Sequence, residues 1–173
     1  GNYSLDAVTT AVAGVAIGHE AGTAVTTGHY NVAIGHQALA TEDAAEGNVA
    51  IGYRALQDQN VDSANNVAIG KFAGLNLTTG TDSVYVGYLA GGSGVIDGDE
   101  NTVVGRTAGY VLTSGAKNVI MGFAAGEAVT TGKENVIIGR GACKDGTLAN
   151  PTSTQGMYNV VVGPGAGNDL TIG

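Results

Sequence analysis

A glycine recurs along this chain at an almost constant spacing, and this repeat limits the possible folds more than any other feature. The interval from Gly18 to Gly35 is typical, and only the interval from Gly139 to Gly163 is clearly longer. So short a period is typical of a solenoid, in which each unit buries its apolar face only against its neighbours. We therefore expect residues 1–173 to form one array of about ten coils. The coils begin near Gly1, Gly18, Gly35, Gly52, Gly70, Gly87, Gly105, Gly122, Gly139 and Gly163.

Each repeated glycine follows a short apolar segment that is rich in β-branched residues, most often Val-Ala-Ile. This composition favours a β-strand with one buried face. We expect the outer two residues, such as Val32 and Ile34, to point into the core and the middle residue, Ala33, to point outward. Such an outward row would form a contiguous apolar patch, which usually marks an interface. An apolar residue such as Leu77, followed by Thr-Thr-Gly, predicts a second short strand and a turn.

The composition agrees with a thin rod. The chain has 30 Gly, no Trp and only two Phe and two Met, so large side chains for a thick core are scarce. An Ala lies three positions after almost every repeated glycine, which predicts close backbone contact there. We expect an all-β fold, a parallel β-solenoid or β-roll with coils of about 17 residues. With strands about 4.8 Å apart, ten coils would form a rod on the order of 48 Å long.

An asparagine precedes most of the strands, four positions before the glycine, and Ser83 takes this place in one copy. Stacking in register would place these residues in a ladder, with each amide bonding to the turn of the next coil. Alternatively, asparagine only tolerates a turn conformation there. The residues of this predicted ladder are Asn31, Asn48, Asn66, Asn101, Asn118, Asn135 and Asn159.

The position directly after the glycine carries aromatic and cationic side chains in successive copies, which stacking would align in one stripe. Such a stripe could hold sugar rings on its aromatic faces and acidic groups on Arg or Lys. Alternatively, these side chains cover a subunit seam or lean on one another. The candidate binding residues are His19, His36, Tyr53, Lys71, Tyr88, Arg106, Phe123 and Arg140.

The motif Asn-Val-x-Ile-Gly-x-x-Ala-Gly, from Asn66 to Gly74 and in variant form from Asn118 to Gly126, resembles a known family. It is similar to the head repeats of trimeric autotransporter adhesins (YadA-like heads) and to repeats of bacteriophage tail fibres. The resemblance implies a left-handed parallel β-roll, an obligate homotrimer, and a place on a bacterial surface or virion. It also implies binding to host proteins, other cells or surface carbohydrate. The longer unit, with Ala-Gly and Thr-Thr-Gly, is more similar to the phage fibres.

A trimer also follows from the narrow repeat, because equivalent strips on identical chains can meet around a three-fold axis. A monomeric two-sided solenoid is the alternative.

Fifteen acidic residues against seven basic ones, a net charge of −8, argue against nucleic acid as a partner. Without a long apolar run we expect no membrane insertion of this segment.

The sequence contains no constellation that is typical of catalysis, so we expect no enzyme and no cofactor. His19, His29 and His36 have no Ser or Asp partner at a fixed spacing, as a catalytic triad requires. The acidic segment 97–101 offers clustered oxygens for Ca²⁺ but lacks calcium-loop spacing, which favours a solvated turn and no metal site. Cys143 is the single cysteine and excludes a disulfide within the chain.

Residues 144–158 interrupt the repeat, and we expect them to form an inserted loop, either a receptor contact or a seam toward another domain. Both ends cut through the repeat, which predicts a fragment of a longer chain. Our interpretation is a non-enzymatic segment of an extracellular fibre that presents a surface to a host glycan or protein. Two alternatives remain: an ice-binding or surface-binding solenoid built on Thr rows, and a subunit of a self-assembling filament.

Overall fold

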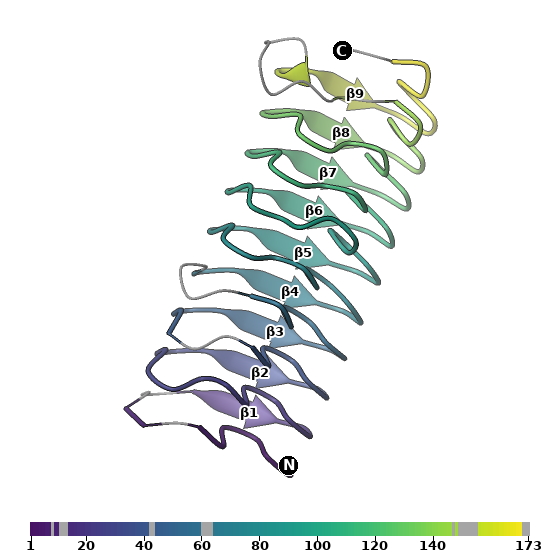
Figure 1. Cartoon of the computed structure of the whole chain (residues 1–173). Helices are drawn as coiled ribbons and strands as arrows, with labels where there is room; N and C mark the ends of the chain where they lie inside the picture. Colours follow the sequence, from purple (N-terminus) through teal and green to yellow (C-terminus); the bar gives the residue numbers. More distant parts are fainter. Residues whose placement is uncertain are drawn as a thin grey trace.

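The computed structural model describes residues 1–7, 9–10, 14–41, 44–59, 64–146, 148 and 156–170. These residues form a nine-stranded sheet in which every strand lies parallel to the strands that precede and follow it in the chain. Figure 1 shows the coils stacked into a rod, with β1 and β9 at opposite ends. The predicted parallel β-solenoid is confirmed. Its strands are β1 (Val15–Ile17), β2 (Val32–Ile34), β3 (Val49–Ile51), β4 (Val67–Ile69), β5 (Val84–Val86), β6 (Thr102–Val104), β7 (Val119–Met121), β8 (Val136–Ile138) and β9 (Val160–Val162).

The strands pair in one constant register along the rod. Ile34 pairs with Ile51, and Ile51 pairs with Ile69, although the second of these intervals is the longer one. The longest interval keeps the same register, since Ile138 pairs with Val162. Additional residues are therefore accommodated outside the strands. Most of the predicted loop at 144–158 lies outside the described residues, namely 147 and 149–155.

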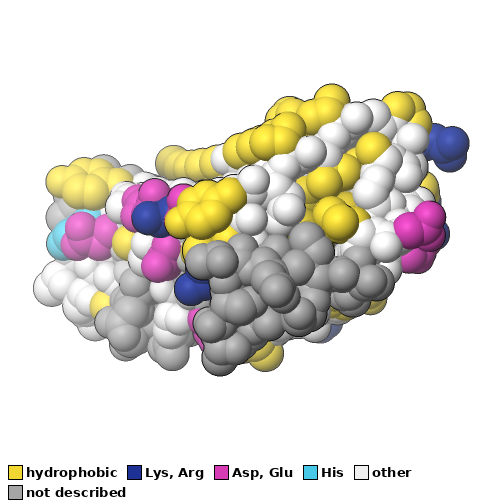
Figure 2. Space-filling model, turned by 90° about the horizontal axis from the view of Figure 1, so that it is seen from above, with side chains coloured by type: hydrophobic (Ala, Val, Ile, Leu, Met, Phe, Trp, Pro, Cys, Tyr) yellow, Lys and Arg dark blue, Asp and Glu magenta, His cyan; other side chains and the backbone are white. Residues whose placement is uncertain are grey.

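The strands bury the face opposite to the one that we expected. The middle residue is the buried one: Ala50, Tyr85 and Ile137 are fully inaccessible to solvent. The outer residues point outward, with exposed fractions of 58% for Ile17 and 62% for Val162. The outward row is thus apolar, as predicted, but it consists of the Val and Ile positions. Figure 2, which looks along the stack, shows hydrophobic side chains following one another along one long edge of the molecule.

The corner that follows each strand explains the repeated glycine. Gly35 and Gly105 have φ angles of 130° and 137°, which side chains disfavour. A Cβ atom at Gly35 would also lie 2.5 Å from the carbonyl oxygen of Gly52 in the next coil. The glycine is therefore needed both for its conformation and for the close stacking of coils. Three positions later, Ala38 and its equivalents up to Ala142 are buried, in agreement with the predicted close backbone contact.

The middle strand residue shares its interior space with the residue four positions after the corner glycine. Where the strand carries Ala50, that later position holds the buried Leu56. Where the strand carries Tyr85, the later position is Gly91, and a Cβ atom there would lie 2.6 Å from the tyrosine ring. Small and large residues thus compensate within these coils, whereas both positions are small at Ala68 and Gly74, where Leu56 and Tyr85 of the neighbouring coils fill the space.

The predicted second strand of each coil is largely absent from the described residues. Leu77, Leu112 and Val129 are fully buried, but outside the named strands only two isolated bridges occur, and one of them joins Leu77 to Ile96. Left-handed backbone conformations, such as that of Leu56 at φ 48°, turn the chain too often for a second continuous strand. Each described coil therefore has one strand and a series of corners. Val8, which we assigned to the same row, lies outside the described residues.

Candidate functional site

The ladder asparagines lie in one row beside the strands, buried except for Asn159, and bond from coil to coil. The backbone N–H of Asn48 donates to Oδ1 of Asn31 at 2.9 Å, and that of Asn66 donates to Oδ1 of Asn48 at 2.9 Å. Ser83 continues the row through its hydroxyl oxygen, which accepts from the N–H of Asn101 at 3.0 Å. The row continues with Asn118, Asn135 and Asn159.

The amide nitrogens of this row bind the preceding turn of the next coil. Nδ2 of Asn66 donates to the carbonyl of Gly80 at 2.9 Å, and Nδ2 of Asn118 donates to the carbonyl of Gly132 at 2.8 Å. Each such amide satisfies one buried N–H and one buried carbonyl of its neighbour. Because unpaired buried backbone groups are costly, this row stabilises the stack and is structural.

The candidate binding stripe lies at the corner directly after each strand, and its side chains are in contact along the rod. The rings of His19 and His36 stack with centroids 5.1 Å apart, and His36 stacks on Tyr53 at 5.4 Å. Phe72 then bridges the row, with centroids 5.2 Å from Tyr53 and 6.4 Å from Tyr88. The constant strand register produces this alignment, since equivalent corners of successive coils lie above one another.

Cations alternate with the rings in the rest of the stripe. Lys71 Nζ lies 5.5 Å from the centroid of Tyr53 and 5.0 Å from that of Phe72. Arg106 lies between Tyr88 and Phe123, with its guanidinium carbon 5.6 Å from each centroid. These are cation–π contacts, which hold both partners in place.

Sequence reasoning missed three members of this surface: Arg54, Phe72 and Lys144. Arg54 lies over the ring of Tyr53 at 5.3 Å. Arg54 and Phe72 both occupy the second position after the glycine, with φ angles of 55° and 60°, and side chains of varied chemistry at that position gave no repeat signal. We call the predicted stripe together with these three residues the ring-and-cation row.

The ring-and-cation row ends at a hollow with a volume of about 290 Å³ near the last coil. Phe123, Arg140 and Lys144 line it together with Asn168, whose Oδ1 accepts from the backbone N–H of Lys144 at 2.8 Å. An aromatic ring and two cations thus surround one concave space. The row contains five of the seven Lys and Arg residues of a chain with net charge −8.

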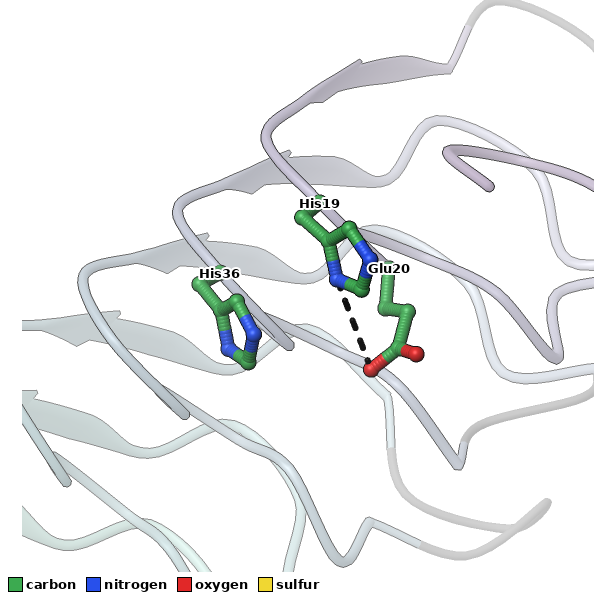
Figure 3. Close-up of side chains that lie close together, drawn as sticks. All are labelled: His19, Glu20 and His36. Atoms are coloured by element: carbon green, nitrogen blue, oxygen red, sulfur yellow. Dashed lines mark ion pairs between the residues drawn. The ribbon is translucent and has the colours of Figure 1, made fainter. Parts of the chain in front are cut away.

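The N-terminal end of the row has a different chemistry. Figure 3 shows His19 and His36 side by side on successive coils, with Glu20 beside them. Glu20 Oε2 lies 3.7 Å from Nδ1 of His19. The sequence analysis assigned no acidic partner to these histidines, because Glu20 follows His19 directly and no repeat pattern marks it.

The other candidate features have partners within the stack. The carboxylate of Asp97 accepts from the hydroxyls of Thr78 and Thr79, and that of Asp99 accepts from the backbone N–H of Thr81 at 2.9 Å. The acidic turn is thus bound to the previous coil. Hydroxyls of the Thr row also bond to neighbouring coils, since Thr113 Oγ1 donates to the carbonyl of Thr130 at 3.0 Å.

Cys143 is buried, and this burial raises the pKa of its thiol above the ordinary value. A thiol is least reactive when it is protonated and shielded from solvent. Cys143 Sγ also lies 3.5 Å from the carbonyl oxygen of Gly146, to which it donates. This cysteine therefore serves the packing of its coil.

Neither a protein-family model, nor a curated protein, nor a solved structure matches this chain. In the part of the chain that the structure describes, no helix has the length and apolar character that are needed to cross a membrane. Inferences about function therefore depend on the surfaces of the solenoid itself.

Proposed function

We propose that this chain is a non-enzymatic segment of an extracellular fibre, on a bacterial surface or a virion, that presents the ring-and-cation row to an acidic glycan. The observation that carries the proposal is the clustering of five of the seven cationic residues with aromatic rings along one row of an otherwise acidic chain. Cations that only balanced the acidic surface would not need to lie together beside aromatic rings. Their alternation with rings provides the two kinds of contact that an acidic sugar needs.

The rings are accessible enough to bind a ligand. The exposed fractions of Tyr53, Tyr88 and Phe123 are 38%, 39% and 47%. Each ring is held by neighbours above or below, so little conformational freedom is lost on binding. In the proposed complex, the hollow at Phe123, Arg140 and Lys144 takes a charged sugar, and the rest of the row takes the following units of the chain.

We further propose that the chain assembles as a homotrimer through the outward face of its strands. That face is apolar in every strand except at Thr102 of β6 and includes Val15, Ile69, Met121, Ile138 and Val160, all of them exposed. A contiguous apolar strip of this kind supports burial against another copy. The resemblance to autotransporter heads and phage fibres supports the same assembly and an extracellular place.

The glycan proposal is tested by binding of sialylated, uronic-acid-containing and neutral oligosaccharides, measured by isothermal titration calorimetry. We expect binding of acidic oligosaccharides that Arg106→Gln and Tyr88→Ala each weaken by about tenfold, the loss of one or two contacts. Lys117→Gln and Tyr30→Ala are the matched controls, because Lys117 pairs with Glu100 and Tyr30 contacts His29, both outside the row. Equal losses in row and control variants, or no binding of any acidic oligosaccharide, would contradict the proposal.

A further inference from the structure

We propose that His19, Glu20 and His36 form a binding site for a divalent transition-metal ion of the zinc class, at the N-terminal end of the rod. The three side chains each offer one ligand atom, and these atoms all lie within 4.8 Å of one another. Two imidazoles and one carboxylate are a common ligand set for zinc in proteins. Three protein ligands also leave a fourth position to water, as in an open zinc site.

The backbone holds these ligands in place. The N–H of Glu20 donates to the carbonyl of Asn2 at 3.0 Å, and the N–H of Gln37 donates to the carbonyl of His19 at 3.0 Å. His19 and His36 occupy the same corner of successive coils, so the sheet register fixes the separation of their backbones. The solenoid therefore brings two histidines that are a full coil apart in the sequence next to each other.

An outer shell of side chains supports the cluster. Nε2 of Gln37 donates to Oε2 of Glu20 at 2.7 Å, and Nε of Arg54 donates to Oε1 of Gln37 at 2.8 Å. The edge of Tyr3 packs against His19 with centroids 6.0 Å apart, and Tyr53 stacks on the other side of His36. Outer-shell contacts of this kind orient metal ligands and raise metal affinity.

The two imidazoles stack nearly parallel, with 10° between their planes. A shared ion lies close to the plane of each ligating ring, so binding needs a rotation of one or both rings about the Cβ–Cγ bond. Both histidines are exposed at the surface, which leaves room for this rotation. The glutamate chain is long enough to follow the ion.

The local charge favours a cation here. Residues 1–53 contain no Lys or Arg, and Arg54 approaches the cluster only through Gln37, whose Oε1 accepts from Nε of Arg54 at 2.8 Å. The same corner position carries histidines in these first coils and Lys71, Arg106 and Arg140 later in the chain. The side chains of the ring-and-cation row thus change along the rod from imidazoles, which can bind a metal ion, to cations, which can bind an anion. The metal site does not depend on the proposed function.

The test is titration of the tag-free chain with Zn²⁺ by isothermal titration calorimetry. We expect saturable binding of one ion per chain, weakened at least about tenfold by His19→Gln and by His36→Gln, each of which removes a ligand. Gln37→Leu should weaken it by a similar factor, because it releases Glu20. His29→Gln is the matched control, since the third histidine lies outside the cluster, and its affinity should equal that of the wild type.

Coordination is checked independently with Co²⁺, whose visible absorption reports nitrogen and oxygen ligands in a tetrahedral site. Circular dichroism establishes that each variant keeps the β-solenoid. The proposal is overturned by three results: absence of Zn²⁺ binding to the wild type, binding that survives both His19→Gln and His36→Gln, or binding that His29→Gln abolishes.

Discussion

A buried asparagine amide must satisfy two donors and an acceptor, and the solenoid provides partners from both neighbouring coils. Nδ2 of Asn118 donates to Oδ1 of Asn101 at 3.1 Å and to the carbonyl of Gly132 at 2.8 Å. Its Oδ1 accepts from the backbone N–H of Asn135 at 3.0 Å. A single residue thus links three successive coils, and removal of its side chain leaves a buried N–H and a buried carbonyl of the next coil unpaired.

We predict that Asn118→Ala lowers the free energy of unfolding by about 2–4 kcal/mol, because the Asn135 N–H and the Gly132 carbonyl remain buried without partners. Asn118→Ser is the matched variant, since Ser83 performs the acceptor role elsewhere in the row. It should cost less than Asn118→Ala. Urea unfolding monitored by circular dichroism measures both losses, and equal losses for Ala and Ser would show that the acceptor is unimportant.

Tyr85 is the largest side chain of the core, and its hydroxyl has no hydrogen-bond partner of acceptable geometry among the described residues. Burial raises the pKa of this phenol well above its ordinary value, with Ser83 and Asn101 nearby as smaller opposing influences. In the unfolded chain the phenol ionises near pH 10. Above that pH the unfolded state alone releases the proton, so stability decreases as the pH rises.

We predict that the free energy of unfolding of the wild type falls more steeply between pH 10 and 11 than that of Tyr85→Phe, by up to about 1.4 kcal/mol per pH unit. At pH 7 the variant should be at least as stable, because it no longer buries an unpaired hydroxyl. Urea unfolding at pH 8, 10 and 11 gives the comparison. Parallel pH profiles for the two proteins would mean that the Tyr85 phenol ionises equally in both states.

At the scale of the coil, two positions share one interior space, the middle strand residue and the residue four positions after the corner glycine. Ala50 is paired with Leu56, whereas Ile120 is paired with Gly126, where a Cβ atom would lie 3.2 Å from the isoleucine. In these coils core volume is therefore maintained by compensation between the two positions, so they can differ in sequence while the strand register stays constant.

We predict that Ala50→Ile and Leu56→Gly are each destabilising, by about 1–3 kcal/mol through overpacking and by about 2–5 kcal/mol through a cavity. The double variant should lose about 1–2 kcal/mol less than the sum, because the new isoleucine fills the space that leucine leaves. Ala50→Ile combined with Leu112→Ala, in a distant coil, is the additive control. Additivity of the Ala50 and Leu56 changes would contradict the shared space.

The sequence predicted the strands, their order and the corner glycines, because each depends on a residue type repeated at one spacing. It did not predict which strand face is buried, because Val-Ala-Ile is apolar at all three positions and has no polar residue to mark the outside. Side-chain size suggested Val and Ile for the core, but each strand from β2 to β9 buries only its middle residue. The pairing of Ala50 with Leu56 and of Tyr85 with Gly91 was the sequence signal for the correct face.

The candidate site was predicted only in part, for a related reason. Repeat alignment placed His19, Tyr53 and Arg106 in one row, since they follow equivalent glycines. It missed Glu20 and Phe72, which reach the same surface from the next position in the chain. Their left-handed backbone conformations, φ 56° and 60°, are dictated by the corner and are not visible in side chains of such different chemistry.

At the scale of the whole molecule, the outward strand face determines the assembly that we propose. This face carries large apolar side chains from β1 to β9, and a single chain leaves many of them exposed. Association of identical chains along this face would remove the apolar area from water without altering any coil.

We predict a solution mass by light scattering of three times the 17.1 kDa of the chain. The pair Ile69→Lys and Ile138→Lys should convert the trimer to a monomer, because it places charges in the buried face. Val95→Lys is the matched control, since Val95 is 56% exposed outside the strands and should leave the trimer intact. A wild type that stays monomeric at all concentrations, or a trimer that survives the double substitution, would contradict this assembly.

The contact between successive corner glycines gives the molecule a further property, a constant axial spacing of its coils. Because the Gly35 corner lies against that of Gly52, and the constant register repeats this contact, each coil adds one fixed rise of about 4.8 Å. Two probes attached at equivalent corners are then separated by that rise multiplied by the number of coils between them. The number of corner glycines between two positions therefore gives their separation along the axis. A chemical group can be placed at a chosen height by choosing the coil that carries it.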